Sequence, residues 1–292
     1  MKRLLLLIAT LAFVAILALQ SGASSTFGTG PPAGVRPEYL ALGDSLAAGI
    51  GASDPDTTGY VPLFHSYLGD ALDPGNADPT PLDSVPDAFN RKLLWLENLG
   101  VGGPGAPPGG ETTGSMIAGG QLDAALAELS ARNGNAMPVD DVRIVTLDIG
   151  GNDAFAVVPA CAGGLTPACA AAISATFATF SANFNLILGE LRAAAGPDTE
   201  IIVMTYYNPL VNPGCPLSSL ASLGNIILEG EPSLGLPLGL NDLIRAIAAS
   251  HGARVAETFG LLGAADVHPD CRHADDSGYQ IIADAFVAAF DD

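Results

Sequence analysis

The sequence predicts an α/β protein built on a five-stranded, doubly wound parallel sheet in three layers. Short apolar runs typical of buried strands alternate five times with longer segments of helical periodicity, which places helices on both faces of such a sheet. No internal repeat and no second core is visible in the 292 residues, so one domain is expected. The expected strands are residues 39–42, 92–98, 141–148, 200–205 and 254–257. The helices expected after them are residues 59–72, 115–131, 170–195, 238–251 and 277–290.

Continuous runs of Leu, Ile and Val identify the strands, because strands buried on both faces of a parallel sheet lack polar alternation. The first run ends at the turn Gly43-Asp44-Ser45, after which residues 46–48 are expected to begin a helix. Each helix is identified by apolar residues that recur on one of its faces. Loops are expected where Gly, Pro and Asp gather, and residues 206–237 are expected to be irregular apart from a short helix near residues 218–228.

Composition and charge exclude several classes of partner. Hydrophobic residues make up 49% of the chain and charged residues 14%, which is enough apolar material for a large core. The formal net charge is −20, with only 11 Lys and Arg residues. That charge repels nucleic acids and anionic membranes, so neither is expected as a partner.

The N-terminus has the three parts of a secretory signal peptide. Lys2-Arg3 is basic, residues 4–19 are apolar, and Ser21-Gly22-Ala23 offers a cleavage site between small residues. The apolar stretch is short for a membrane-spanning helix, although an uncleaved anchor is the alternative. We therefore expect a secreted protein with no stable membrane partner beyond the signal peptide. The expected parts are a signal peptide, a Gly/Pro linker and one domain: residues 1–23, 24–37 and 38–292.

Four cysteines in an exported chain indicate two disulfides, for which three pairings are possible. Cys161 and Cys169 bracket a compact loop that could close on itself, which leaves Cys215 and Cys271 to pair. A structural zinc site is not indicated, because no Cys-x-x-Cys pair occurs.

The residues that follow each strand are the most informative, because ligands of doubly wound sheets bind at the carboxyl ends of the strands. Ser45 follows the first strand, glycine N–H groups ending at Gly110 follow the second, and Asn152 follows the third. Asp270 and His273 follow the fifth. A hydroxyl, backbone and amide donors, and an acid–base pair are what acyl transfer requires.

Four sequence blocks, in order from Gly43 to Tyr279, resemble the SGNH, or GDSL-type, family of esterases and lipases. Together the blocks are specific, whereas the first alone would not be. The resemblance implies a flavodoxin-like three-layer fold and ester hydrolysis without a metal or other cofactor. The matching segments are Gly43-Asp44-Ser45-Leu46, Asn98-Leu99-Gly100 with Gly110-Glu111-Thr112-Thr113, Gly151-Asn152-Asp153, and Asp270-x-x-His273 with Gly278-Tyr279.

The same resemblance implies a role for each site residue. Ser45 would be the nucleophile and, through its backbone N–H, an oxyanion donor. The Asn152 side chain and a glycine of the second block would be the other donors. His273 would be the base, oriented by Asp270.

The second block departs from the family pattern, because seven residues, 104–110, are inserted. Counting forward from Asn98 selects Gly103 as the backbone donor, and counting back from Glu111 selects Gly110. We favour Gly110, because a donor N–H at the start of the following helix gains from the helix dipole.

Two histidines compete for the role of base. His268 lies in His-Pro, the commoner form of the family's last block. His273 has Asp270 three residues before it, whereas Ala265 stands three before His268. His273 is also five residues before Gly278, which is where the resemblance places the base. We therefore expect His273 to be the base and His268 to be a solvated loop side chain.

Other interpretations fit less well. Residues 100–105 match the dinucleotide pattern G-x-G-x-x-G, but prolines keep them out of a helix and they follow the second strand. No serine has the Gly-x-Ser-x-Gly setting of α/β-hydrolase lipases. The aspartates of residues 266–276 lack the spacing of a calcium loop. A catalytically idle binding module stays open as an alternative, although all four blocks are present.

The substrate is the least determined feature. Residues 156–171 and 206–237 would hold the acyl chain, and the second segment is rich in Leu, Ile and Pro. Aromatic residues are only 6% of the chain, so we favour acyl or lipid esters over carbohydrate acetyl esters, which are the alternative. We expect a monomer whose partner is a small-molecule or lipid ester.

Overall fold

The computed structural model describes residues 36–72 and 94–291, which belong to one compact unit of residues 33–292. Five parallel strands form the sheet in the order β2-β1-β3-β4-β5, the order of flavodoxin-like doubly wound folds. The predicted fold class is therefore confirmed. The expected signal peptide and all but the end of the expected linker lie outside the described residues. The strands are β1 Glu38–Gly43, β2 Trp95–Asn98, β3 Val142–Asp148, β4 Glu200–Met204 and β5 Arg254–Ala256.

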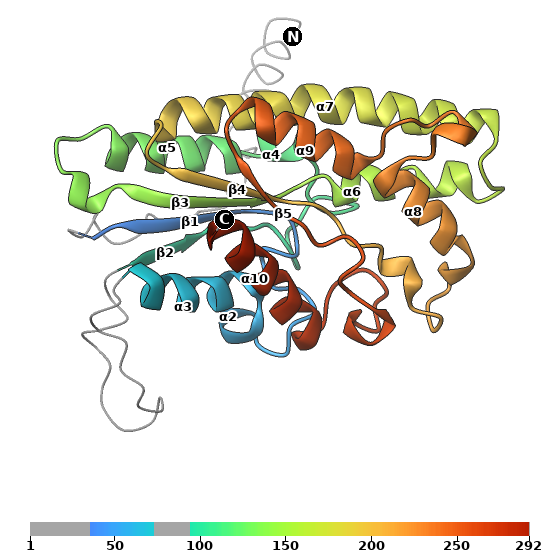
Figure 1. Ribbon diagram of the computed structural model, residues 1–292, viewed down its shortest axis with the longest axis horizontal. Coiled ribbons are helices and arrows are strands. Elements are labelled where there is room, and N and C mark those ends of the chain that lie inside the picture. The colour runs from blue at the N-terminus through green and yellow to red at the C-terminus, as the bar shows by residue number, and fades with distance from the viewer. Residues whose placement is uncertain (1–35, 73–93, 292) are drawn as a thin grey trace, which may run out of the picture. The chain divides into compact units, whose positions relative to one another are not determined.

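Helices on both faces of the sheet give the molecule its three layers (Figure 1). These helices are α2 Pro55–Thr58, α3 Tyr60–Leu72, α4 Thr113–Ala118, α5 Gln121–Asn133, α6 Gly151–Phe155, α7 Pro167–Ala195, α8 Ala221–Glu229, α9 Leu240–Ser250 and α10 Asp276–Asp291. One layer consists of α3 packed against α10, with the short α2 beside them. The other consists of α5, α7 and α9, with α4 against α7. Both α6 and α8 follow strands at their carboxyl ends.

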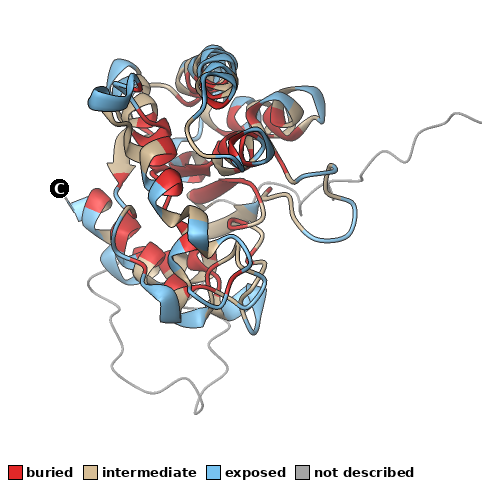
Figure 2. Ribbon diagram, turned by 90° about the vertical axis from the view of Figure 1, so that its right-hand side faces the viewer, coloured by how far each residue is buried: buried red, intermediate tan, exposed pale blue. Residues whose placement is uncertain are grey.

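The centre of the sheet is the most buried part of the molecule (Figure 2). All six residues of β1 are buried, because β1 pairs with β2 on one side and β3 on the other. The Tyr39 hydroxyl lies 2.8 Å from the Thr146 hydroxyl of β3, so even this polar group has a partner in the core. Beneath the sheet, the Tyr60 ring of α3 stacks on Phe286 of α10 with the ring centroids 4.9 Å apart. This burial explains why the strands are read as continuous apolar runs.

Two expected helices differ in the structure. The helix expected over residues 115–131 is two helices, α4 and α5, separated by Gly119-Gly120, and Gly120 has a φ of +90° that a helix interior excludes. The helix expected from residue 46 is wrong, since residues 44–51 form successive turns. Here the Ala47 N–H donates to the carboxylate of Asp148 at 3.2 Å, a long-range contact that overrides the helical propensity of Leu and Ala.

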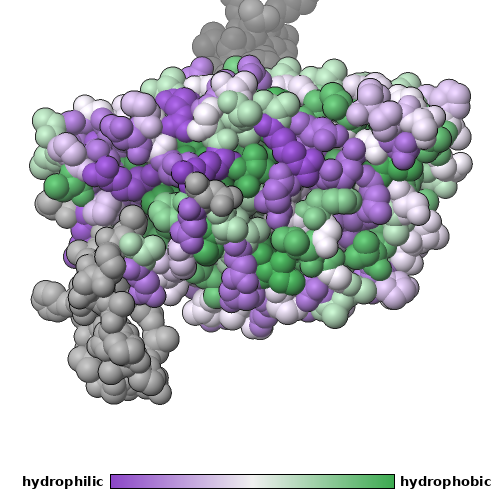
Figure 3. All heavy atoms as spheres, viewed as in Figure 1, coloured by the Kyte–Doolittle hydropathy of each residue, from purple (hydrophilic) through white to green (hydrophobic). Residues whose placement is uncertain are grey.

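The longest helix, α7, is long and apolar enough to cross a membrane by length and composition alone. Its large side chains, such as Phe180, Phe184 and Ile187, are buried, while small and polar residues such as Ser174 and Thr179 face outward. That division is typical of a helix packed on a globular core. Over the face shown in Figure 3, hydrophilic and hydrophobic residues are interspersed across the surface.

Candidate active site

Ser45 stands in a tight turn directly beyond β1. Gly43 ends the strand with a φ of +149°, and a Cβ atom at this position would overlap the carboxylate of Asp148. The turn is held by two hydrogen bonds: the Asp44 N–H donates to the Asp148 carbonyl at 3.0 Å, and the Leu46 N–H donates to Asp44 Oδ1 at 2.9 Å. The backbone of Ser45 is therefore fixed by its neighbours at the carboxyl end of β1.

His273 and Asp270 meet Ser45 from the loop that precedes α10. His273 Nε2 lies 2.8 Å from Ser45 Oγ, and His273 Nδ1 lies 2.6 Å from Asp270 Oδ2. Asp270 Oδ1 accepts the backbone N–H groups of Arg272 and His273 at 3.0 and 3.1 Å. Partial burial acts to raise the pKa of Asp270, but the hydrogen bonds from His273 and the charge of its imidazole lower it to about 2. A carboxylate that stays ionised can orient the imidazole and stabilise its charged form.

The second histidine of this loop also contacts Asp270. His268 Nδ1 lies 3.1 Å from Asp270 Oδ2, and its backbone N–H donates to the His273 carbonyl at 2.9 Å. His268 is a loop residue whose side chain is 39% exposed, as expected, and it contacts Asp270 in addition. The His268 ring does not displace His273. His273 Nδ1 lies 2.6 Å from Asp270 Oδ2, whereas His268 Nδ1 lies 3.1 Å from the same oxygen.

Two disulfides join the pairs that the sequence spacing favours. One links Cys161 to Cys169, at the start of α7, and the other links Cys215 to Cys271. Cys271 lies between Asp270 and Arg272 and has a φ of +64°, which is uncommon for a residue other than glycine. The second disulfide thus fixes the middle of the loop that carries His273 to the segment before α8.

Asn152 lies in the first turn of α6 and is buried. Its Nδ2 donates to the Glu111 carbonyl at 2.8 Å and lies 3.5 Å from Asp44 Oδ2. The second contact is at the limit of a hydrogen bond, so one of the two amide hydrogens is weakly engaged. The Ser45 N–H has no acceptor among the described residues. Asn152 and Ser45 both line the same pocket.

The structure does not decide between Gly103 and Gly110 as the backbone donor of the second block. Gly110 lies against Asn152, since a Cβ atom on Gly110 would be 2.6 Å from Asn152 Nδ2. Its N–H, however, donates to the Pro107 carbonyl at 2.9 Å and is engaged in a turn. The residues just before the insertion pack on the serine turn. A Cβ on Gly102, next to Gly103, would be 3.0 Å from Ser45 Cα. Both candidate stretches thus border the site from different sides.

A pair of buried carboxyl groups lies beneath the serine turn. Asp44 and Asp148 hydrogen bond to each other, while Tyr206 donates to Asp44 at 3.0 Å and Tyr60 donates to Asp148 at 2.8 Å. Burial, together with the negative charge of Asp44, raises the pKa of Asp148 well above its usual value, and burial also raises the pKa of Asp44. Two buried carboxyl groups in contact cannot both be ionised without strong repulsion, so the pair shares a proton.

A mostly apolar pocket opens beside Ser45 and His273. Its walls come from α6 and the turn after it, from the segment that follows β4, and from α8. A second hollow adjoins the first, since both are lined by Phe155, Leu210, Arg272 and His273, and it reaches Leu217 and Asp270. Within the described part of the chain, no group of His, Cys, Asp and Glu side chains is arranged to hold a metal ion. The apolar residues that line the first pocket include Phe155, Val158, Tyr207, Leu210, Ile227 and Leu228.

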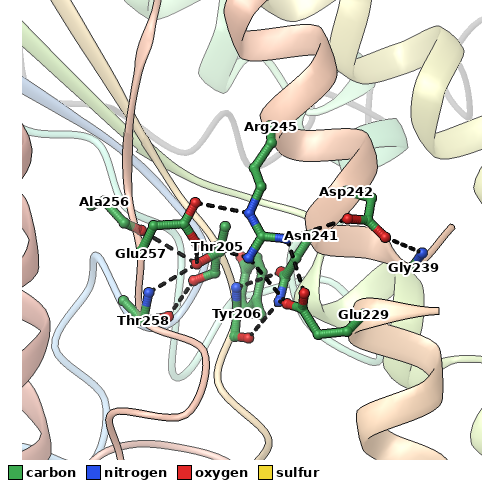
Figure 4. Close-up of polar contacts among 10 residues, drawn as sticks. All are labelled: Thr205, Tyr206, Glu229, Gly239, Asn241, Asp242, Arg245, Ala256, Glu257 and Thr258. Carbon is green, nitrogen blue, oxygen red and sulfur yellow. Dashed lines mark hydrogen bonds and ion pairs between the residues drawn. The ribbon is translucent and has the colours of Figure 1, made fainter. Parts of the chain in front are cut away.

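A polar network fixes the pocket wall to the sheet (Figure 4). Asn241 of α9 accepts the Tyr206 N–H at 2.7 Å and donates to the Tyr206 carbonyl at 3.0 Å. Arg245 of α9 binds Glu229, at the end of α8, at 2.9 Å and Glu257, beyond β5, at 2.8 Å. The network therefore holds α8 in place as well as Tyr206, whose hydroxyl contacts Asp44.

Sequence reasoning missed the residues that act through tertiary contacts. Gln121 of α5 donates to the carbonyls of Gly43 and Leu99 at 2.9 and 2.8 Å, so its amide joins the ends of β1 and β2. For Asp148, the sequence predicts a place at the end of a strand but no contact with the serine turn. A polar residue inside an otherwise apolar run is the one signal that could have indicated it.

The fold and the site together define a class. A doubly wound sheet whose strand ends bring a serine hydroxyl, an imidazole and a carboxylate into one hydrogen-bonded chain has the constellation of a serine hydrolase. Residues 41–281 match the model of the GDSL-like Lipase/Acylhydrolase family, and the chain belongs to that family. It is thus a carboxylic ester hydrolase, and the resemblance drawn from the four blocks is confirmed.

Solved structures with this fold include esterases and lipases. The lipase Lip_vut3 from a goat rumen metagenome has a TM-score of 0.58 at 16% identity, covering 87% of this chain and 97% of its own. The acetylxylan esterase Axe2 from Geobacillus stearothermophilus has a TM-score of 0.50 at 16% identity, covering 87% of this chain and 93% of its own. At such identities the likeness shows a shared fold. A comparison with curated protein sequences gives no match.

Proposed function

We propose that this chain hydrolyses acyl or lipid esters through an acyl-enzyme formed on Ser45. The observation that carries the proposal is the continuous chain of contacts from Ser45 Oγ to His273 Nε2 at 2.8 Å and from His273 Nδ1 to Asp270 at 2.6 Å. His273 is in reach to take the serine proton as Oγ attacks the carbonyl carbon of the ester. Asp270 stabilises the imidazolium that results.

The remaining steps use the same groups. His273 gives its proton to the leaving alcohol oxygen as the bond to the carbonyl carbon breaks, which leaves the acyl group on Ser45. A water molecule, deprotonated by His273, then attacks the acyl-enzyme and releases the acid. The oxyanion of each tetrahedral intermediate would be bound by the Ser45 N–H and Asn152 Nδ2, with Gly110 as a third donor if its N–H leaves the Pro107 carbonyl.

The first pocket supports an acyl chain as the group held beside Ser45. Side chains such as Leu210, Ile227 and Leu228 offer apolar surface that an acyl chain can bury. Axe2 is an acetylxylan esterase, but its likeness to this chain extends to the fold alone, and no described feature favours a sugar over an acyl chain. Carbohydrate acetyl esters, and a catalytically idle binding module, are the alternatives that the assay below separates.

Export of the protein is part of the same proposal. Residues 1–23 would be a signal peptide, residues 24–37 a linker, and residues 38–292 the secreted hydrolase domain. The two disulfides support this proposal, because such bonds persist in oxidising compartments outside the cytosol.

Replacing the nucleophile tests the proposal directly. Ser45→Ala should lower kcat on p-nitrophenyl esters by roughly 10⁴-fold or more, and should abolish labelling by a fluorophosphonate probe. Ser174→Ala, an exposed serine of α7, is the matched control and should leave both readouts at the wild-type level. Residual activity above a few per cent of wild type in a folded Ser45→Ala protein would reject Ser45 as the nucleophile. An acetylated xylan run beside esters of rising chain length separates the two substrate classes.

A further inference from the structure

Arg272 is the residue between the disulfide and the candidate base, and it borders both hollows beside His273. Its backbone is fixed twice: the N–H donates to Asp270 Oδ1 at 3.0 Å, and the carbonyl accepts the Tyr207 hydroxyl at 3.0 Å. Its guanidinium lies over the Phe155 ring, 4.7 Å from the ring centroid. The charge is thus held at the boundary between the two hollows by a cation–π contact.

The charge of Arg272 is unpaired within the described part of the chain. Five other arginines of the described chain bind carboxylates or backbone carbonyls through their guanidinium groups: Arg132, Arg143, Arg192, Arg245 and Arg254. Arg272 forms no side-chain hydrogen bond and no ion pair with any described residue, although the chain carries a net charge of −20. Asp270 is near in sequence, but its oxygens are taken by the histidine rings and two backbone N–H groups.

The side of the site on which Arg272 acts follows from the chemistry of the proposed function. The leaving oxygen of the ester must receive its proton from His273 Nε2, so the alcohol part of the substrate lies on the histidine side. The first pocket reaches Ile227 and Leu228 of α8, where a charged group would lose its hydration without compensation. The second hollow, bounded by residues 270–273 and Leu217, borders His273 and is where the alcohol part has room.

We propose that Arg272 is a specificity-determining residue that binds an anionic group, a phosphate or a carboxylate, on the alcohol part of the ester. This inference rests on the proposed ester hydrolysis at Ser45. A planar guanidinium binds either anion through paired hydrogen bonds, and its half-buried position over Phe155 strengthens that attraction relative to water. The substrate class would then be an acyl ester whose alcohol carries a negative charge, such as the headgroup of an anionic lipid.

Matched esters of one acyl chain test the inference. The substrates are the hexanoates of 4-carbamoylphenol, 4-carboxyphenol and 4-(phosphonomethyl)phenol, which are neutral, a carboxylate and a phosphonate. For each enzyme, kcat/KM on a charged ester is divided by kcat/KM on the neutral ester, and variants are compared by that ratio, so the intrinsic reactivity of each leaving group cancels. The carboxylate and phosphonate arms report which anion is preferred.

Arg272→Gln should lower the charged-to-neutral ratio by about ten- to a hundredfold, mainly through KM, because a charge-assisted contact is lost. Arg272→Lys, which keeps the charge, should retain part of the preference. Arg143→Gln is the control: it also removes one positive charge, but at the amino end of β3, whereas the site lies at the carboxyl ends of the strands. It should leave the ratio unchanged. High salt should weaken the wild-type preference.

The possible failures are distinguishable. An unchanged ratio in Arg272→Gln, with all three esters hydrolysed, overturns the assignment of Arg272 and leaves the proposed function standing. An equal loss on charged and neutral esters overturns it as well, because Arg272 would then act only on the position of the loop. If the wild-type protein hydrolyses none of the esters, both the proposed function and the inference are overturned.

Discussion

Asp270 reaches Ser45 through His273, whereas Asp148 binds the serine turn directly, and their surroundings give the same side chain opposite properties. Asp270 is partly exposed, receives two backbone N–H groups and an imidazole, and has a pKa lowered to about 2. Asp148 is fully buried, borders another carboxyl group, and has a pKa raised well above its usual value. The surroundings of Asp270 favour its charged form, and those of Asp148 favour its neutral form.

The contrast shows that the balance between hydrogen-bond donors on one side, and burial and neighbouring charge on the other, decides which form of a carboxyl group is stable. Donors that point at Asp270 stabilise its charge, so it can in turn stabilise a charged His273. Asp148 has donors too, from Tyr60 and the Ala47 N–H, but burial and the charge of Asp44 outweigh them. A proton shared between Asp44 and Asp148 leaves one negative charge, not two, below the turn that carries Ser45.

The largest effect is expected for Asp270→Asn, which keeps the shape of the side chain and removes its charge. kcat should fall by about 10⁴-fold, because the amide cannot stabilise the imidazolium and favours the wrong tautomer of His273. Steady-state kinetics on a p-nitrophenyl ester measures the loss. Asp284→Asn, on the exposed face of α10, is the control and should keep wild-type kcat. A loss below tenfold would remove the distinction drawn between the two aspartates.

Asp148→Asn should act on stability rather than on kcat. Because the folded-state pKa is raised, Asp148 contributes stability that is complete below the unfolded-state value of about 4 and is lost as the pH rises toward the folded-state pKa. The amide cannot ionise, so this decline should be flatter in the variant. Its single acceptor oxygen cannot serve both Tyr60 and Ala47, so the variant should be less stable than wild type at low pH, by about 1 kcal/mol.

Urea unfolding at acidic and mildly alkaline pH measures both the loss of stability at low pH and the decline of stability with rising pH. Tyr60→Phe removes a hydrogen bond of Asp148 but leaves its carboxyl group titratable, so its destabilisation should not flatten the decline with pH. Parallel pH curves for wild type and Asp148→Asn would show that Asp148 is ionised in the folded protein, as Asp270 is.

The smallest effect is expected for His268→Ala. Its ring lies 3.1 Å from Asp270, whereas the backbone bond that braces His273 is retained by alanine. kcat should fall by less than about tenfold, because His268 is one of several partners of Asp270 and contacts with an exposed carboxylate contribute little energy. The double variant with Asp270→Asn should be no slower than Asp270→Asn alone, since the His268 ring acts on that carboxylate. If His268→Ala were as slow as Asp270→Asn, His268 would be the base.

The elements and residues that local sequence determines were predictable. Alternating apolar runs and helical segments indicated the five strands, and the three-residue spacing of Asp270 and His273 already favoured His273 over His268. Contacts between distant segments were not predictable in this way. Gln121 braces β1 from the α5 helix, and the turn after Ser45 replaces a helix because its N–H groups bond to Asp44 and Asp148. Such partners are known only once the sheet is assembled.

The hydrogen bond between Ser45 and His273 joins residues 228 positions apart in the chain. At synthesis rates of roughly 5–20 residues per second, the serine leaves the ribosome about 10–50 s before the histidine. During that interval the nascent chain contains Ser45 but not His273. Every strand of the sheet is also made before His273, so this contact is among the last that folding can form. The topology therefore postpones the contact between Ser45 and His273 until β5 and the loop after it have been made.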